Sequence, residues 1–206
     1  MPSLATFAAF SLIALGMVLT PGPNMIYLVS RSISQGRVAA FLSLIGVGAG
    51  FLVYMLAAAL GITSLLLAVP YAYDALRFAG ALYLLYLAWQ TLRPGGRSPF
   101  QVRSLPPDSP RRLLAMGLLT NLLNPKVAVM YLSLLPQVIE PEQGSVLAQA
   151  VVLGFAQIAI SLSVNAILIV IAGSLSVFFI TRPTWLAVQR WLMGTVLAAF
   201  AVRMAT

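Results

Sequence analysis

The chain has 206 residues, of which 61% are apolar and only 8% are charged, and its mean hydropathy is +0.98. Soluble domains are about half apolar and a quarter charged, so this composition indicates a helical protein that crosses a membrane several times. The sequence has no cysteine and no histidine. Their absence excludes disulfides, thiolate and imidazole metal ligands, and Ser-His or Cys-His nucleophile pairs.

The formal net charge is +8, which in a soluble protein would suggest a nucleic-acid partner. Here the arginines lie in short gaps between apolar runs. We therefore interpret them as topology signals and as contacts with anionic lipid head groups, and we expect no nucleic-acid partner. No basic residue precedes the first apolar run, so we expect that run to remain as a mature helix rather than a cleaved signal peptide.

Six apolar runs are long enough to cross a bilayer, which takes about 20 residues. They cover residues 4–30, 38–69, 71–92, 113–136, 145–180 and 185–202, and a polar loop over 93–112 separates the third run from the fourth. The fifth run is too long for one straight span. We predict a span over 146–171, followed by an interfacial segment after Gly173.

The second run contains Gly46, Gly48 and Gly50. Glycines at this spacing can let another helix approach closely, but glycine is also common in membrane helices without such a role. The sequence leaves these two interpretations open.

Two of the runs are interrupted by proline. Pro21, Gly22, Pro23 and Asn24 interrupt the first run, and Asn124, Pro125 and Lys126 interrupt the fourth. Proline removes a backbone donor and clashes with the carbonyl four residues back. In hydrocarbon, such a break is tolerated only where protein or a water-filled cavity surrounds it. We predict discontinuous membrane helices that help to form a substrate site; the alternative is a pair of proline kinks that bind nothing.

The breaks fall at corresponding places in two halves, 1–92 and 113–206. Each half has three spans, and an odd number of spans gives the halves opposite orientations. The predicted fold is therefore an all-α membrane protein, one domain over 1–206, with six transmembrane helices as two inverted three-helix repeats and with helices 1 and 4 broken. The substrate site is expected near the midplane, where the broken helices meet.

Several polar residues within the runs are candidates for that site. A charge at the centre of a membrane helix costs about 2.5–3.5 kcal/mol, so Lys126 should face the interior, unless it lies near the interface and reaches lipid phosphate. Asp74 either carries protons or pairs with Arg77, one turn along the helix. Gln157 and Asn165 either line a cavity or form hydrogen bonds between helices.

The chemistry of helix breaks suggests a ligand with both charges. Free N–H groups at a helix start favour an anion, and free carbonyls at a helix end favour a cation. An amino acid presents a carboxylate and an ammonium, and the amides of Asn24 and Asn124 add neutral donors and acceptors.

The stretch L-T-P-G-P-N, followed by S-R-S-I-S-Q-G-R, and the stretch L-L-N-P-K, followed by L-S-L-L-P-Q, resemble the LysE/RhtB amino-acid exporter family. The resemblance implies a bacterial inner-membrane protein that exports amino acids or close derivatives, driven by the proton gradient. It places the motif residues Pro21, Gly22, Pro23, Asn24, Asn124, Pro125 and Lys126 in the substrate site. Some relatives carry Asp where this chain has Asn24, which argues against proton transfer at that position.

Arginines concentrate in the gaps after spans 1, 3 and 5, so the positive-inside rule places both termini outside the cytoplasm. The expected partners are an amino acid, protons and membrane lipid, with no cofactor, and the oligomeric state stays open, a homodimer being one option. Three other functions are alternatives. A small-cation or metal exporter would want more carboxylates within the spans. An intramembrane enzyme would need an acid or nucleophile pair, and the sequence offers none; an assembly subunit that does not transport is the third.

Overall fold

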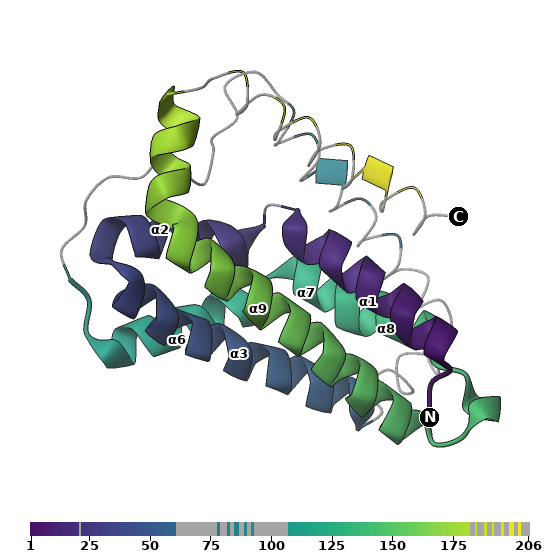
Figure 1. Cartoon of the computed structure of the whole chain (residues 1–206). Helices are drawn as coiled ribbons and strands as arrows, with labels where there is room; N and C mark the ends of the chain where they lie inside the picture. Colours follow the sequence, from purple (N-terminus) through teal and green to yellow (C-terminus); the bar gives the residue numbers. More distant parts are fainter. Residues whose placement is uncertain are drawn as a thin grey trace.

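The computed structural model describes residues 1–20, 22–60 and 107–181, with isolated positions between 78 and 92 and between 184 and 202; over 175–181 only the backbone is described. Regular structure in these residues is helical (Figure 1). The predicted spans over 71–92 and 185–202 lie largely outside the described residues, as does most of the predicted loop over 93–112. Asp74 and Arg77 lie outside them too, and so does Pro21.

The first predicted run forms two helices, as its prolines indicate. Helix α1 spans Leu4–Leu19, and it begins after Ser3, whose hydroxyl accepts a hydrogen bond from the Thr6 N–H at 3.0 Å. Helix α2 spans Pro23–Gln35, with proline in its first turn, where the missing N–H costs nothing. The two helices are bent by 51° relative to one another. The predicted break in this run is confirmed.

The fourth predicted run is broken in the same way. Helix α6 spans Pro110–Leu122 and α7 spans Pro125–Val129, and the two parts of the run are bent by 50°. After α7 the chain continues through a π-helical turn, η1 (Met130–Leu134), into α8 (Leu135–Gln137). The wider π turn lies just before Pro136, whose ring cannot pack against a carbonyl four residues back in a regular α-helix.

Helix α6 begins at Pro110, three residues before the predicted start of this run at 113. Ser109 caps it by accepting a hydrogen bond from the Arg112 N–H at 3.4 Å. The predicted loop boundary at 112 was therefore too late. Serine followed by proline is a helix-start signal, but the paired arginines made this stretch look like loop.

Two helices are unbroken. Helix α3 spans Arg37–Ala59, and α9 spans Val146–Thr181, after a short 3-10 turn, η2 (Pro141–Gln143). Helix α9 continues through Gly173 without interruption, and its last part is inclined to the rest in Figure 1. The stretch of α9 that is apolar enough to cross a membrane is 146–174, close to the predicted span over 146–171; the interfacial place of the residues after Gly173 stays a prediction. Helix propagation adds a hydrogen bond per residue, and a single glycine costs only about 1 kcal/mol.

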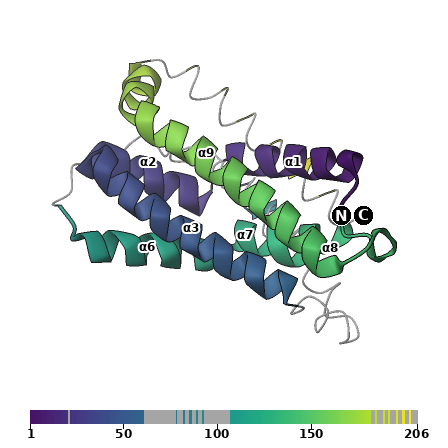
Figure 2. The same cartoon turned by 60° about the horizontal axis from the view of Figure 1, so that its bottom comes forward.

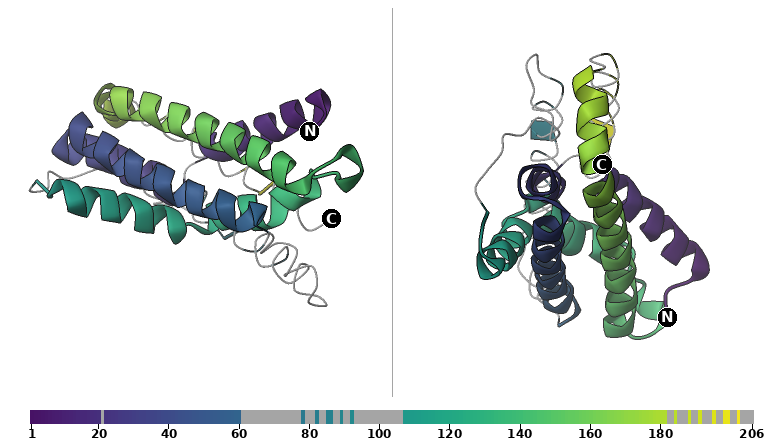
Figure 3. Two further views of the ribbon diagram at one scale, coloured as in Figure 1. Left: turned by 90° about the horizontal axis from the view of Figure 1, so that it is seen from below. Right: turned by 60° about the vertical axis from the view of Figure 1, so that its left-hand side comes forward.

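By length and apolar composition, α3 and residues 146–174 of α9 can each cross a membrane. Each bent pair adds a further candidate span, which gives up to four among the described residues. The six-helix inverted repeat stays a prediction. Helix α9 packs against both α1 and α3 and lies between them in the right-hand view of Figure 3.

Helices α3 and α6 run side by side at very short distance (Figure 2). A Cβ built on Gly46 would lie 2.1 Å from the Leu114 carbonyl oxygen, and one on Gly117 would lie 2.1 Å from the Ser43 carbonyl oxygen. A Cβ on Gly50 would lie 2.7 Å from the Asn121 side chain. These glycines therefore let the helix backbones touch. Gly48 differs, since it meets only Leu162 of α9 at an ordinary 3.6 Å.

We predict that Gly117→Ala lowers the free energy of unfolding by about 1–3 kcal/mol, because the new methyl group forces two backbones apart. Gly173→Ala is the matched control: it also lies within a helix, and no described atom is within 4 Å of its would-be Cβ. It should be neutral or stabilising, since alanine favours the helix by about 0.5–1 kcal/mol. Denaturant unfolding in detergent measures both, and equal effects would contradict the close-packing argument.

Candidate functional site

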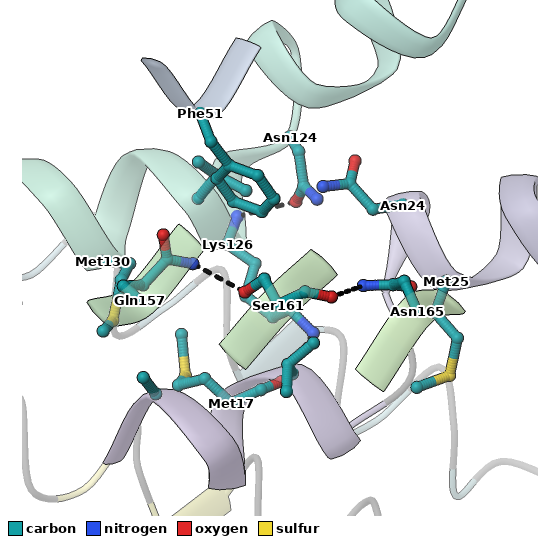
Figure 4. Close-up of a pocket in the computed structure, with 13 residues that line it drawn as sticks. Met17, Asn24, Met25, Phe51, Asn124, Lys126, Met130, Gln157, Ser161 and Asn165 are labelled. Carbon is teal, nitrogen blue, oxygen red and sulfur yellow. Dashed lines mark hydrogen bonds between the residues drawn. The ribbon is translucent and has the colours of Figure 1, made fainter. Parts of the chain in front are cut away.

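The two helix breaks meet at one buried cavity of about 40 Å³ (Figure 4). This space suffices for a few water molecules and is smaller than an amino acid. Its polar lining comes from both breaks and from α9: Asn24, Asn124, Lys126, Gln157, Ser161 and Asn165. Its apolar lining is Ala14, Met17, Val18, Met25, Phe51, Val127 and Met130.

The structure therefore brings together five residues that the sequence singled out from three separate places: Asn24 in the first break, Asn124 and Lys126 in the second, and Gln157 and Asn165 in α9. Gly22, Pro23 and Pro125 shape the breaks beside the cavity without lining it. Binding of a substrate by any of these residues stays a prediction.

Lys126 joins the two breaks. Its Nζ donates hydrogen bonds to the Met17 carbonyl oxygen at 2.8 Å, the Thr20 carbonyl oxygen at 2.7 Å and the Thr20 hydroxyl oxygen at 3.2 Å. Lysine has three donors, and here each has a partner. The last carbonyls of a helix have no partner in the helix and carry partial negative charge. The lysine of the second break therefore caps α1, the helix that ends at the first break.

Asn124 and Gly22, one from each break, adjoin Lys126. Asn124 caps α7, with its Oδ1 accepting a hydrogen bond from the Lys126 N–H at 3.0 Å. On the opposite side, a Cβ on Gly22 would lie 2.9 Å from the Lys126 Nζ. The side chain of Lys126 is buried, with 8% of the residue exposed, so it does not reach toward lipid phosphate.

A row of polar side chains on α9 forms another wall of the cavity. Gln157, Ser161 and Asn165 are four residues apart and so share one helix face. The Tyr131 hydroxyl donates to Gln157 Oε1 at 2.5 Å, and Gln157 Nε2 donates to the Ser161 hydroxyl oxygen at 2.8 Å. Gln157 thus both lines the cavity and bonds to another helical segment. Asn165 donates from Nδ2 to the Ser161 carbonyl oxygen at 2.8 Å, within its own helix.

Three amide atoms in this cavity are buried without a hydrogen-bond partner among the described residues: Asn24 Oδ1, Asn124 Nδ2 and Asn165 Oδ1. An unsatisfied buried group costs about 1–3 kcal/mol. Such groups in a native structure point to water or to a ligand. The cavity thus offers one donor and two acceptors in addition to the ammonium of Lys126.

Sequence reasoning missed a second polar cluster, at the far end of α2. Asp108 pairs with the buried Arg31 of α2 and, at 2.9 Å, with Arg112 of α6, and it accepts a hydrogen bond from Gln35 Nε2 at 3.1 Å. Arg31 also lies 5.3 Å from the centre of the Tyr27 ring. The sequence offered one local signal, an acid four residues before Arg112. The contact with Arg31, 77 residues away, had none.

A second helix end near the breaks is also capped by a side chain. The Tyr54 hydroxyl donates to the Leu122 carbonyl oxygen at 2.8 Å, at the C-terminal end of α6. The Tyr54 ring stacks on Tyr131 with ring centres 5.9 Å apart. Tyr54 and Tyr131 therefore pack against each other and also form hydrogen bonds to polar groups beside the cavity.

These features define a multi-pass helical membrane protein whose broken spans enclose a buried polar cavity. The family model LysE type translocator matches residues 15–206. The chain therefore belongs to the LysE type translocator family, and it is a transporter.

Curated relatives cover almost the whole chain. An uncharacterized membrane protein of Pseudomonas aeruginosa is 30% identical over 219 residues, which include all of this chain and 98% of the relative. Leucine efflux proteins of Salmonella choleraesuis and Salmonella paratyphi A are each 27% identical over 197 residues, covering 94% of this chain and 91% of the relative. No solved structure matches.

We predict that Lys126→Met lowers the free energy of unfolding by about 1–3 kcal/mol for each oxygen left without a donor. Methionine retains a flexible apolar side chain of similar length, so the loss of stability reports the removal of the ammonium group alone. Arg111→Met is the control, because it removes one positive charge at an exposed position. Chemical unfolding of the purified proteins compares them, and equal losses would show that net charge, not the capping of α1, is responsible.

The Asp108 cluster predicts a pH dependence. Burial opposes ionisation of Asp108, but the Gln35 hydrogen bond and the charges of Arg112 and Arg31 outweigh it, and the pKa of the carboxyl group is lowered. Its stabilisation is therefore complete above the ordinary aspartate pKa of about 4 and is lost as the pH falls through the lower folded-state value.

Asp108→Asn should accordingly lower the melting temperature at pH 7 and make no difference once the carboxyl group of the wild type is protonated. Glu142→Gln, at an exposed position, is the control and should have little effect at either pH. Melting curves from pH 3 to pH 7 in detergent would show this. A difference between Asp108→Asn and the wild type that is independent of pH would contradict the ion-pair argument.

Proposed function

We propose that this transporter exports an amino acid across the bacterial inner membrane by alternating access, in exchange for protons. The observation that carries the proposal is the meeting of two broken helices at one polar cavity, joined by Lys126. Broken membrane helices commonly supply the substrate sites of secondary transporters. The resemblance to proteins named leucine efflux protein supports an amino acid as the substrate.

The size of the cavity supports alternating access. The space of about 40 Å³ is smaller than an amino acid, which supports a rearrangement of the surrounding helices when a substrate binds. Lys126 holds α7 to the end of α1 in this closed arrangement. A movement of α1 away from α7 would break this contact.

The distribution of arginines supports the predicted orientation, in which both termini lie outside the cytoplasm. Arg31, Arg37, Arg111 and Arg112 lie at the end of the bundle where α2 meets α3 and α6 begins, while the N-terminus lies at the opposite end (Figure 1). By the positive-inside rule, the arginine-rich end faces the cytoplasm and the N-terminus lies outside. With six spans, the C-terminus lies outside as well.

Proton exchange can drive export because one charge that crosses 100 mV releases about 2.3 kcal/mol. Asp74 is the candidate for the proton-carrying group, since the described lining of the cavity contains no carboxylate. In the Asp74→Asn variant, amino-acid transport should then no longer respond to a proton gradient, whereas counterflow of the amino acid should persist.

Counterflow of labelled amino acids in proteoliposomes tests the function, first with leucine and then with a panel of other amino acids. We expect the wild type to exchange at least one aliphatic amino acid and to concentrate it only when a proton gradient is imposed. Gly22→Ala should reduce the rate at least tenfold, because its methyl group would lie within 2.9 Å of the Lys126 Nζ. Gly173→Ala serves as the matched control. Absence of counterflow for the whole panel would refute the proposal.

A further inference from the structure

We infer that the cavity recognises the two charged ends of a zwitterionic amino acid with separate groups. Lys126 and the Asn124 amide N–H take the carboxylate, and the amide oxygens of Asn165 and Asn24 take the ammonium. The inference rests on the proposed function, and it adds the assignment of each polar group and the class of side chain that fits.

The orientation of two amides follows from their hydrogen bonds. Asn124 uses its oxygen to cap α7, which leaves Nδ2 as a donor in the cavity. Asn165 uses its nitrogen to bond the Ser161 carbonyl, which leaves Oδ1 as an acceptor there. Asn124 is 1% exposed and Asn165 is 2% exposed. Neither free atom therefore meets bulk water. Asn124 Nδ2 can only donate a hydrogen bond, and Asn165 Oδ1 can only accept one.

The donor lies on the same turn as Lys126. Asn124 and Lys126 both belong to the start of α7, where the backbone N–H groups of residues 126–128 are already bonded to Asn124. The donors left for a ligand there are Asn124 Nδ2 and the Lys126 ammonium. A carboxylate there would gain a charge-assisted hydrogen bond, which is about twice as strong as a neutral one. It would compete with three neutral oxygens of Met17 and Thr20 for the ammonium of Lys126. Binding of the carboxylate therefore draws Lys126 away from the end of α1.

The acceptors lie on other elements. Asn165 belongs to α9 and Asn24 to the start of α2, and Figure 4 shows the two side chains entering the cavity from these separate helices. Amide oxygens suit an ammonium, which has three donors and no acceptor. A ligand that joins Asn165 to Asn124 must therefore carry both an acceptor end and a donor end.

The remaining lining selects the side chain of the ligand. Met17, Met25, Phe51 and Met130 are apolar, and methionine adapts its shape to fill irregular space. Lys126 is the only charged residue in the described lining, so a cationic side chain would face a like charge. The structure thus favours aliphatic, electrically neutral amino acids over basic ones.

Lys126 is the only lysine in the sequence, so lysine labelled with 15N at Nζ gives a single side-chain signal. We would add three probes to the labelled wild type: L-leucine; 4-methylpentanoate, which lacks the ammonium; and 3-methylbutylamine, which lacks the carboxylate. We expect the first two to shift the signal at saturation and the amine to leave it in place. A shift by the amine equal to that by leucine would overturn the inference.

Two variants separate the two ends, with binding measured by calorimetry. Asn124→Asp keeps the cap of α7 but replaces the donor with an anionic oxygen. It should lower the affinity for 4-methylpentanoate at least tenfold and leave the affinity for 3-methylbutylamine unchanged. Asn165→Leu roughly keeps the volume of the side chain and removes the acceptor oxygen. It should lower the affinity for 3-methylbutylamine at least tenfold and leave the affinity for 4-methylpentanoate unchanged. L-Leucine should lose affinity in both.

The reverse pattern, or an equal loss of both probes in both variants, would overturn the assignment. So would absence of binding by leucine and by both analogues. Counterflow of another amino acid in proteoliposomes would in that case leave the export function standing. The two failures are therefore distinguishable.

Discussion

The structure depends on one contact, in which a lysine from the second half of the chain caps a helix in the first. Lys126 gives all three of its donors to oxygens at the end of α1. A buried charge is expensive unless it is paired or fully hydrogen-bonded, and a helix that ends in a membrane leaves carbonyls that need donors. The oxygens at the end of α1 and the ammonium of Lys126 thus satisfy each other.

This arrangement gives transport a physical basis. The partners of Lys126 are neutral oxygens, which hold an ammonium less strongly than a carboxylate does. A carboxylate that enters the cavity can therefore displace the contact with α1 at modest cost, and the differential affinity of the two states for the substrate shifts the balance between them. Helices α1 and α7 are joined by the same residue that would bind the substrate.

Elsewhere the bundle is built to remain closed. Glycines bring the backbones of α3 and α6 into contact, and Asp108 ties the end of α2 to the start of α6. Close backbone packing and paired buried charges both resist small displacements. Helix α1 is held differently, by its packing on α9 and by the hydrogen bonds of Lys126.

The sequence alone determined the class of protein and the position of both helix breaks, because composition and proline act locally and leave direct marks in the chain. It left two places open for Lys126, the protein interior or the lipid interface, and the burial of its side chain in the structure decided for the interior. Only the tertiary structure decided what Lys126 binds, because the Met17 and Thr20 carbonyls belong to the backbone, which every sequence shares. The pairing of Arg31 with Asp108 likewise depends on a contact between segments 77 residues apart, for which no local pattern codes.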